Sequence, residues 1–411
     1  MLHIDNCVEI NPYAHLDYRL DNNSSAHFYN YNSDKTDISQ YCNQISWFQM
    51  IDIVDKTDCC GCNACVQCCS KQCITMQEDE EGFLYPSVDK NLCINCGLCE
   101  KVCSVINQYE SCEPLIAYAA KNQDTNIQAS SSSGGIFTSI AEIVIREDGV
   151  VFGARFDDKW EVVHDYIETI DELIVFRGSK YVQSRIGNSF LEAEGFLKQG
   201  RKVLFTGTPC QISGLNHFLH KDYDNLLTLD VACHGVPSPL VWREYLKYTT
   251  ENRHISYISF RDKRISWEQY GLSVRTRDFD ESSDEERDCF EPVHNNLYMQ
   301  IFLKDLDLRS SCHACTAKVG RSHSDITLAD FWGIQSVNPS LHDKRGVSLV
   351  LANSEKGSKV IDKLGIDKTD VPFLTAIRYN PSLIKSTPKP KQRAEFWVVF
   401  KRGGFDECRF L

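Results

Sequence analysis

Cysteines with a repeated spacing are the residues of this chain best suited to chemistry. Two runs each have the spacing C-x2-C-x2-C-x3-C. The runs consist of Cys59, Cys62, Cys65 and Cys69, and of Cys93, Cys96, Cys99 and Cys103. Every cysteine of the second run lies 34 residues after its counterpart in the first, so the runs form an internal repeat. This spacing is typical of thiolates that bind two [4Fe-4S] clusters.

The fourth thiolate of each cluster is expected to cross between the runs. Three thiolates on one short loop can bind three corners of a cubane, and in bacterial ferredoxins with two clusters the fourth comes from the other run. We expect one cluster, here called the Cys59 cluster, on Cys59, Cys62, Cys65 and Cys103. The other, the Cys93 cluster, is expected on Cys93, Cys96, Cys99 and Cys69.

A disulfide framework or a zinc site is the alternative interpretation of such a cysteine-rich segment. Disulfides persist in oxidising compartments, but the first residues lack the basic stretch and apolar stretch of a secretory signal. Structural zinc usually takes two C-x2-C pairs at wider separation. Iron-sulfur is therefore favoured, with Cys60, Cys68 and Cys73 beside the clusters as non-ligands. We expect a cytoplasmic protein.

Composition excludes two other classes of partner. A formal net charge of -13 argues against nucleic acid, since phosphate binding draws on clustered lysine and arginine. No apolar run approaches the roughly 20 residues that cross a bilayer, so we expect no membrane span.

The elements that position these cysteines suggest three parts. Residues 1–49 are polar and aperiodic and are expected to be a loose N-terminal extension. Residues 50–112 would form a bacterial-type ferredoxin domain, with a hairpin from 74–76 and 83–85 between the runs. Residues 113–411 are long enough for a larger globular domain.

The larger domain is expected to mix helices and strands. Apolar periodicity predicts helices over 136–145 and 239–249. Strands are predicted over 150–154, 203–205, 226–231, 255–260, 272–275 and 325–329. The fold class is therefore α+β: a ferredoxin domain with two clusters followed by a larger mixed α/β domain.

Four further cysteines of this domain are candidates for a third metal centre. They are Cys210, Cys233, Cys312 and Cys315. Two of them follow predicted strands, where loops commonly assemble sites. From spacing alone, buried structural cysteines are an equal alternative, and zinc also suits thiolates.

Three short segments could together bind a nucleotide diphosphate. Ser132–Gly135 precedes a predicted helix, whose first N–H groups and dipole favour a phosphate, although it could equally be a flexible linker. Residues 177–181 supply cations and hydroxyls, and Thr206-Gly207-Thr208 a tight turn after a strand.

Four strings of residues resemble the coenzyme F420 hydrogenase/dehydrogenase beta-subunit family. They are VLFTGTPCQISGL at 203–215, CHGVPSP at 233–239, GSKYVQS at 178–184, and SCHAC at 311–315 followed by SDITLADFWGI. The resemblance extends from about Cys59 to Arg393. It implies a domain that binds FAD and an iron-sulfur centre, often fused behind a ferredoxin with two clusters.

The resemblance also implies which residues bind these groups. It makes Cys210, Cys233, Cys312 and Cys315 the ligands of a third [4Fe-4S] cluster. The FAD contacts that it favours are Ser132, Ser133, Gly134, Gly135, Lys180, Tyr181, Thr206, Gly207 and Thr208. In archaeal members the acceptor is coenzyme F420, whereas related bacterial sequences occur without it.

These features predict an iron-sulfur flavoprotein oxidoreductase. Electrons would pass between the clusters and FAD, then to or from an organic acceptor, F420 or another small molecule, in either direction. A redox partner protein, such as a ferredoxin or a reductase subunit, would exchange electrons with the clusters. Two alternatives stay open: a non-catalytic electron-transfer subunit of a larger redox complex, and a polysaccharide-associated enzyme with structural clusters.

Overall fold

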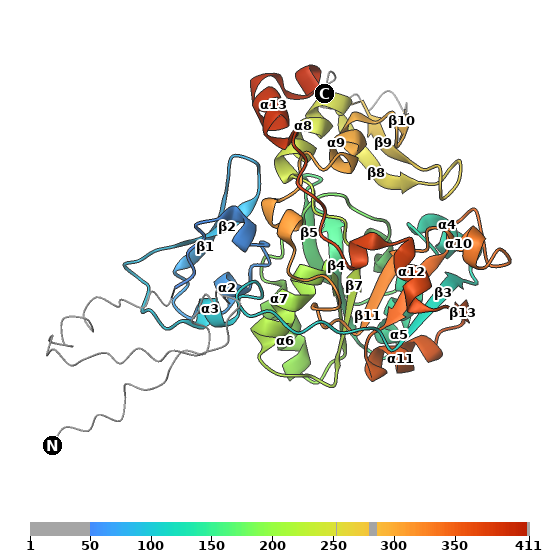
Figure 1. Ribbon diagram of the computed structural model, residues 1–411, viewed down its shortest axis with the longest axis horizontal. Coiled ribbons are helices and arrows are strands. Elements are labelled where there is room, and N and C mark those ends of the chain that lie inside the picture. The colour runs from blue at the N-terminus through green and yellow to red at the C-terminus, as the bar shows by residue number, and fades with distance from the viewer. Residues whose placement is uncertain (1–49, 252, 279–285, 409–411) are drawn as a thin grey trace, which may run out of the picture. The chain divides into compact units, whose positions relative to one another are not determined.

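The computed structural model describes residues 50–251, 253–278 and 286–408 (Figure 1). The N-terminal extension expected at 1–49 lies outside the described residues. The described residues form one compact unit, which holds both the cysteine runs and the larger body. The domain boundary expected at residue 112 stays a prediction.

An antiparallel hairpin separates the two cysteine runs, as predicted. Its strands are β1 (Ile74–Glu78) and β2 (Leu84–Val88). Asp79 closes the turn, because its Oδ1 accepts hydrogen bonds from the backbone N–H groups of Glu81 at 3.0 Å and Phe83 at 2.9 Å. The short helices of this segment are η1 (Lys56–Asp58), α2 (Ala64–Gln67) and α3 (Leu98–Lys101).

The body is built on an eight-stranded mixed sheet. The strand order is β13-β3-β12-β11-β7-β6-β4-β5. The strands are β3 (Ile116–Asn122), β4 (Val150–Phe156), β5 (Val162–Ile167), β6 (Val203–Gly207), β7 (Leu226–Val231), β11 (Ile326–Asp330), β12 (Ser348–Ala352) and β13 (Ile366–Asp370). The central strands β4, β6, β7 and β11 are parallel to one another, so their carboxyl ends meet at one edge of the sheet.

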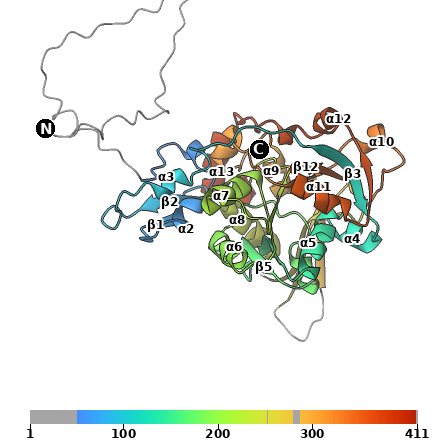
Figure 2. The same ribbon diagram turned by 90° about the horizontal axis from the view of Figure 1, so that it is seen from below.

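Helices cover both faces of this sheet. They are α5 (Ile136–Arg146), α6 (Ser189–Lys198), α7 (Pro209–Leu219) and α11 (Glu355–Asp362). Helices α5 and α11 share a core with Val151 and Leu204, whereas α6 and α7 share another with Val150 and Val203; the two pairs lie apart in Figures 1 and 2. Successive residues of a strand face opposite sides, so strands covered on both faces are continuously apolar.

A second, antiparallel sheet has the order β10-β9-β8. Its strands and the helices that share its core are β8 (His254–Asp262), β9 (Gly271–Arg277), β10 (Glu286–Pro292), α8 (Pro239–Thr250), α9 (Leu297–Leu303) and α13 (Arg393–Cys408). Trp242, Phe260 and Tyr298 are fully buried at the centre of that core. The remaining described helices are α4 (Thr125–Ser130), η2 (Asp171–Val175), η3 (Ser310–Ala314), α10 (Ile334–Val337), α12 (Phe373–Arg378) and η4 (Pro381–Leu383).

Every helix and strand predicted for the body is present, with ends within two residues of the expected ones. The α+β class is confirmed. Periodicity located these elements well because each is covered by apolar neighbours on a defined face.

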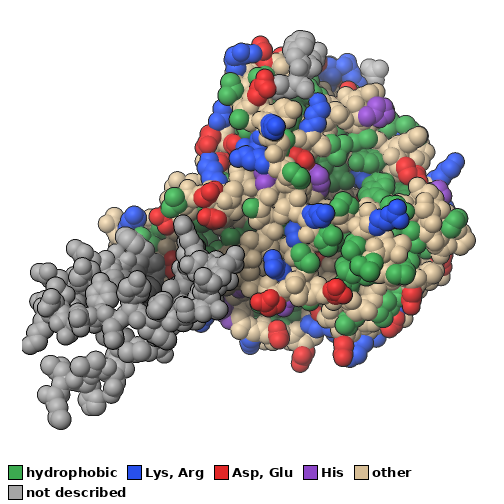
Figure 3. All heavy atoms as spheres, viewed as in Figure 1, with side chains coloured by type: hydrophobic (Ala, Val, Ile, Leu, Met, Phe, Trp, Pro, Cys, Tyr) green, Lys and Arg blue, Asp and Glu red, His purple; other side chains and the backbone are tan. Residues whose placement is uncertain are grey.

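The surface in view carries mixed charge. Lys and Arg side chains are interspersed with Asp and Glu over the face shown in Figure 3. None of the described helices combines the length and the apolar content that crossing a membrane requires.

A glycine at the tip of the hairpin provides a test of how the hairpin packs on the body. Gly82 has φ +84°, and a Cβ there would overlap the Leu240 side chain and lie 2.6 Å from Leu240 N in α8. We expect Gly82→Ala to cost about 1 kcal/mol for left-handed strain and about 1–3 kcal/mol more for the clash. The free energy of unfolding in a denaturant series measures both.

Gly200→Ala is the matched control for this prediction. Gly200 has φ +82°, but nothing lies within 4 Å of the added Cβ. Gly200→Ala should therefore lower the free energy of unfolding only by the cost of the left-handed strain. Equal losses in the two variants would contradict the packing of the hairpin tip against α8.

Candidate functional site

A large cavity lies at the carboxyl edge of the parallel strands. Its volume is about 800 Å³, within the range of small-molecule and cofactor sites. The loops after β6, β7 and β11 line it, together with the N-terminal end of α5. Open α/β sheets bind ligands at this edge.

Most of the residues expected to contact FAD line this cavity. They are Ser132, Ser133, Gly135, Lys180, Tyr181, Thr206, Gly207 and Thr208. Gly134 is not among the lining residues, because it packs against the sheet: a Cβ there would lie 2.6 Å from the Ala120 carbonyl oxygen. Its N–H donates to Ser348 Oγ at 3.0 Å. The structure thus brings the three predicted segments to one cavity, and their contact with FAD stays a prediction.

Two cations bind the backbone of the serine-glycine turn. Arg261 Nη2 donates to the Ser132 carbonyl at 3.4 Å, and Lys263 Nζ to the Ser133 carbonyl at 3.3 Å. Gly135 has φ +82° and precedes the first turn of α5, a conformation that glycine adopts without a steric penalty. The positive end of the α5 dipole therefore borders the cavity.

A closed series of hydrogen bonds holds the Thr206-Gly207-Thr208 turn. His164 Nε2 contacts the Thr206 carbonyl at 2.9 Å and must donate, because a carbonyl oxygen only accepts. Ser184 Oγ then donates to His164 Nδ1 at 2.9 Å and accepts from Gln211 Nε2 at 2.9 Å. Gln211 Oε1 accepts from the Thr208 N–H at 2.9 Å. Every member has a partner, so the turn is fixed before any ligand binds.

Sequence reasoning missed both His164 and Gln211. A signal existed for Gln211, since Thr208 and Gln211 form the capping box T-x-x-Q at the start of α7. None existed for His164, which lies on β5 and reaches Thr206 only through the pairing of β5, β4 and β6.

Two cations that line the cavity, Lys180 and Arg177, differ in how many of their hydrogen-bond donors already have partners in the protein. Lys180 Nζ donates to the carbonyls of Val175 at 2.9 Å and of Arg177 and Gly178 at 3.2 Å. Burial lowers the pKa of Lys180 to about 7, whereas these carbonyls favour the charged amine. Arg177 donates from Nε to Thr138 Oγ1 at 3.1 Å, and neither of its Nη groups has a hydrogen-bond partner among the residues that the structure describes.

The four candidate cysteines of the third centre come together, although 105 residues separate Cys210 from Cys315. Each thiol lies within electrostatic range of at least two others of the set. Cys210 follows β6, Cys233 follows β7, and Cys312 lies on η3. The Val236 N–H donates to Cys312 Sγ at 3.4 Å, and Cys233 itself lines the cavity.

Burial sets the protonation of these thiols. It raises the pKa of Cys312 to about 12 and that of Cys233 to about 11. Each thiol therefore holds its proton at neutral pH and must release it when a metal binds. The donor set of sulfur atoms alone suits iron-sulfur chemistry.

The thiols of the two runs group in a way that is consistent with the crossed assignment. Cys65 and Cys103 each lie near Cys59, and Cys62 lies near Cys65. The four thiols expected to bind the Cys93 cluster line one small cavity: Cys69, Cys93, Cys96 and Cys99. Cys60, expected as a non-ligand, lies within hydrogen-bonding reach of both Cys62 and Cys210. The ligand assignments stay predictions.

All cysteines in the part of the chain that the structure describes are free thiols. Among those residues, no three His, Cys, Asp or Glu side chains converge on a position for a single metal ion. A cubane spreads its thiolates more widely than one ion does, because each thiolate binds a different iron.

The pKa of His164 predicts how stability depends on pH. Burial lowers this pKa from 6.5 to about 4. Between these two pH values, His164 is therefore protonated in the unfolded chain and neutral in the folded chain. Stability is complete above pH 6.5 and falls as the pH drops toward 4. We expect a loss of about 1 kcal/mol between pH 7.5 and 5.5, measured by chemical denaturation, and His164→Gln to remove that part of the slope.

His254→Gln is the control, since His254 is exposed at the start of β8. It should leave the slope unchanged. If His164→Gln keeps the full slope, the buried neutral state of His164 is wrong.

Comparisons with known proteins identify the family. Two models of the coenzyme F420 hydrogenase/dehydrogenase beta subunit match this chain, the N-terminal model over residues 117–189 and the C-terminal model over residues 200–370. Among curated proteins there is no match. A chain of the F420-reducing [NiFe] hydrogenase complex from Methanosarcina barkeri shares 15% identity over 73% of this chain and 91% of its own, with a TM-score of 0.43.

The two family models together span most of the body, including the cavity edge and Cys210, Cys233, Cys312 and Cys315. The predicted resemblance is confirmed. The chain belongs to the coenzyme F420 hydrogenase/dehydrogenase beta-subunit family and has an iron-sulfur electron-transfer role as an oxidoreductase.

Proposed function

We propose that this chain is an iron-sulfur flavoprotein that moves electrons between three [4Fe-4S] clusters and FAD, and to or from an organic acceptor. One observation carries the proposal: the four cysteines proposed for the third cluster, here called the Cys210 centre (Cys210, Cys233, Cys312 and Cys315), adjoin both the first cysteine run and the large cavity. Cys210 lies beside Cys60, which follows Cys59 in the chain, and Cys233 lines the cavity. Bound clusters carry single electrons, and a bound flavin exchanges them for a hydride.

The cavity supports FAD through its size and its charges. About 800 Å³ suits a large cofactor. Helices α5 and α7 both begin at its wall, so their positive ends favour a diphosphate. Arg177 adds Nη donors that no described residue binds, and Phe137, Tyr181 and Trp332 supply apolar and aromatic surface for a ring system.

The exposure and the neighbours of the proposed ligands give the order in which electrons would pass through the three centres. Cys96 is exposed, which makes the Cys93 cluster accessible to a redox partner protein such as a ferredoxin or a reductase subunit. The Cys59 cluster would be second in this path, because the loop that carries its ligands adjoins Cys210. The Cys210 centre then adjoins the cavity, where a small-molecule acceptor would meet the flavin. Coenzyme F420 is one candidate acceptor, and the cytoplasm is the expected location.

Metal and flavin analysis of anaerobically purified protein tests this proposal. We expect about twelve iron atoms per chain, four for each of three clusters, together with FAD released on denaturation. About eight iron atoms and no flavin after reconstitution would overturn the proposal and leave an electron-transfer subunit.

Replacement of Cys210 should separate the third centre from the other two. We expect Cys210→Ser to retain about eight iron atoms and to lose electron transfer from the clusters to the flavin, because the link to the cavity is removed. Cys289→Ser is the control, since Cys289 is exposed on β10. Full iron content in Cys210→Ser would refute the ligand role.

Arg177→Gln should weaken FAD binding. A charge-assisted hydrogen bond contributes about 1.5–3 kcal/mol, so the dissociation constant should rise about tenfold or more. Equilibrium dialysis with fluorescence of free FAD measures it. Arg146→Gln is the matched control, because Arg146 is exposed and pairs with Glu142. Equal affinity in both variants would rule out Arg177 as an FAD contact.

A further inference from the structure

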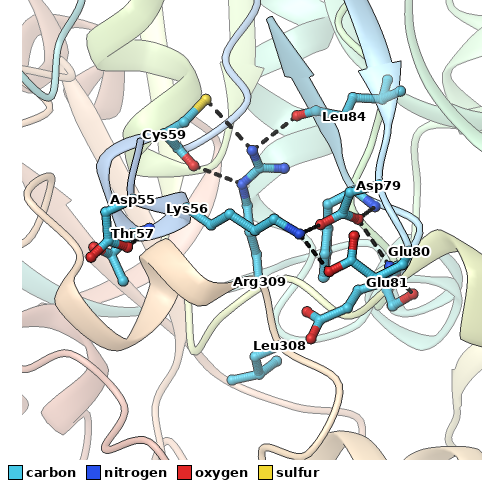
Figure 4. Close-up of polar contacts among 12 residues, drawn as sticks. Asp55, Lys56, Thr57, Cys59, Asp79, Glu80, Glu81, Leu84, Leu308 and Arg309 are labelled. Atoms are coloured by element: carbon cyan, nitrogen blue, oxygen red, sulfur yellow. Dashed lines mark hydrogen bonds and ion pairs between the residues drawn. The ribbon is translucent and has the colours of Figure 1, made fainter. Parts of the chain in front are cut away.

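Arg309 is a fully buried arginine that reaches from the body into the cysteine segment (Figure 4). Its Nε donates to the Cys59 carbonyl at 2.8 Å, and its Nη2 to the Leu84 carbonyl at 2.9 Å. Nη2 also points at Cys59 Sγ, 3.6 Å away. Nη1 donates to Gln183 Oε1 at 3.1 Å.

The charge of Arg309 has no carboxylate partner among the described residues. Its hydrogen bonds end on two carbonyls, one amide and one sulfur, and its guanidinium lies over the Tyr85 ring at 4.2 Å. Isolated buried charges are costly, and natural proteins pair them. Arg393, also buried, follows that rule, since it pairs with Glu81.

The group that can supply the missing negative charge is the thiolate of Cys59. A thiolate bound to a cluster carries negative charge to the place where Nη2 points, and sulfur accepts charge-assisted hydrogen bonds. Within the described parts of the chain, Nη2 contacts no other group that can carry a negative charge.

Arg309 also belongs to the loop of the third centre. The Cys312 N–H donates to the Arg309 carbonyl at 2.9 Å, and the Arg309 N–H donates to the Val236 carbonyl at 3.0 Å. One residue thus touches a ligand of the Cys59 cluster with its side chain and the Cys210 centre with its backbone.

We propose that Arg309 is the buried counter-charge of the Cys59 cluster, which raises the reduction potential of that cluster and holds it next to the Cys210 centre. This inference rests on the cluster assignment of the proposed function, but not on FAD. Reduction adds one electron, supplied by the redox partner protein, and so increases the negative charge beside Arg309 by one. A fixed cation in a buried site stabilises that added charge. Arg309 is a positioning residue, since it acts through Cys59.

Redox titration of the purified full-length protein with dithionite, followed by electron paramagnetic resonance, tests the proposal. We expect Arg309→Gln to shift the midpoint potential of the Cys59 cluster downward and to leave that of the Cys93 cluster unchanged. Cys59→Ser identifies which signal belongs to the Cys59 cluster. Arg309→Lys keeps the charge and should restore most of the potential.

Arg393→Gln is the matched control. Arg393 is a buried arginine that binds Glu81 at the hairpin tip and the Leu308 carbonyl at 2.8 Å. Its loss loosens the same packing without removing a charge that faces a thiol. We expect unchanged midpoint potentials in this variant.

Three results would overturn the inference: unchanged potentials in Arg309→Gln, an equal shift in Arg393→Gln, or loss of the Cys59 cluster in both Arg309→Gln and Arg309→Lys. If Arg309→Gln alone loses that cluster, a near-normal potential in Arg309→Lys supports the charge role. Iron content is measured first, so wild-type protein without clusters would refute the proposed function rather than the role of Arg309.

Discussion

Electrons pass between two centres only when those centres lie close together, so the packing of the cysteine segment on the body is the constraint on which the rest depends. Polar contacts enforce it. Asn63 Nδ2 donates to the Gly187 carbonyl at 2.6 Å. Gln67 Oε1 accepts from the N–H groups of Phe190 at 3.0 Å and Leu191 at 3.1 Å. Since Asn188 makes no side-chain cap at α6, Gln67 satisfies N–H groups that would otherwise be orphaned.

The carboxyl edge of the parallel strands explains why the cysteines proposed for the third centre and the cavity lie in one region. Strands β6 and β7 run side by side in the same direction, so the residues that follow them emerge together. Cys210 and Cys233 are two of those residues. Polar side chains around this edge bind backbone groups of the turns that they support, as His164 does at Thr206. A site built this way keeps its shape at little cost when a ligand binds.

Local patterns were enough to predict the elements and the metal motifs. The four cysteines of each run fall within eleven residues, so their spacing alone was enough to predict that they bind [4Fe-4S] clusters. Strands β6 and β7 begin with consecutive buried apolar residues, and α5 repeats its apolar residues with helical period, so each of these elements could be recognised from its own residues. The resemblance to the family rested on similarly short strings.

The sequence by itself determined the elements, the cysteine motifs and three short segments that line the cavity. Only the tertiary structure decided that Cys315 lies near Cys210, that His164 supports the turn at Thr206, and that Arg309 reaches Cys59. These pairs are 105, 42 and 250 positions apart in the chain. Their partners are set by strand order and by packing between segments, which no local periodicity encodes. Arg309 shows this most clearly, because its role can be inferred only once the structure shows that its charge is buried and faces a thiol.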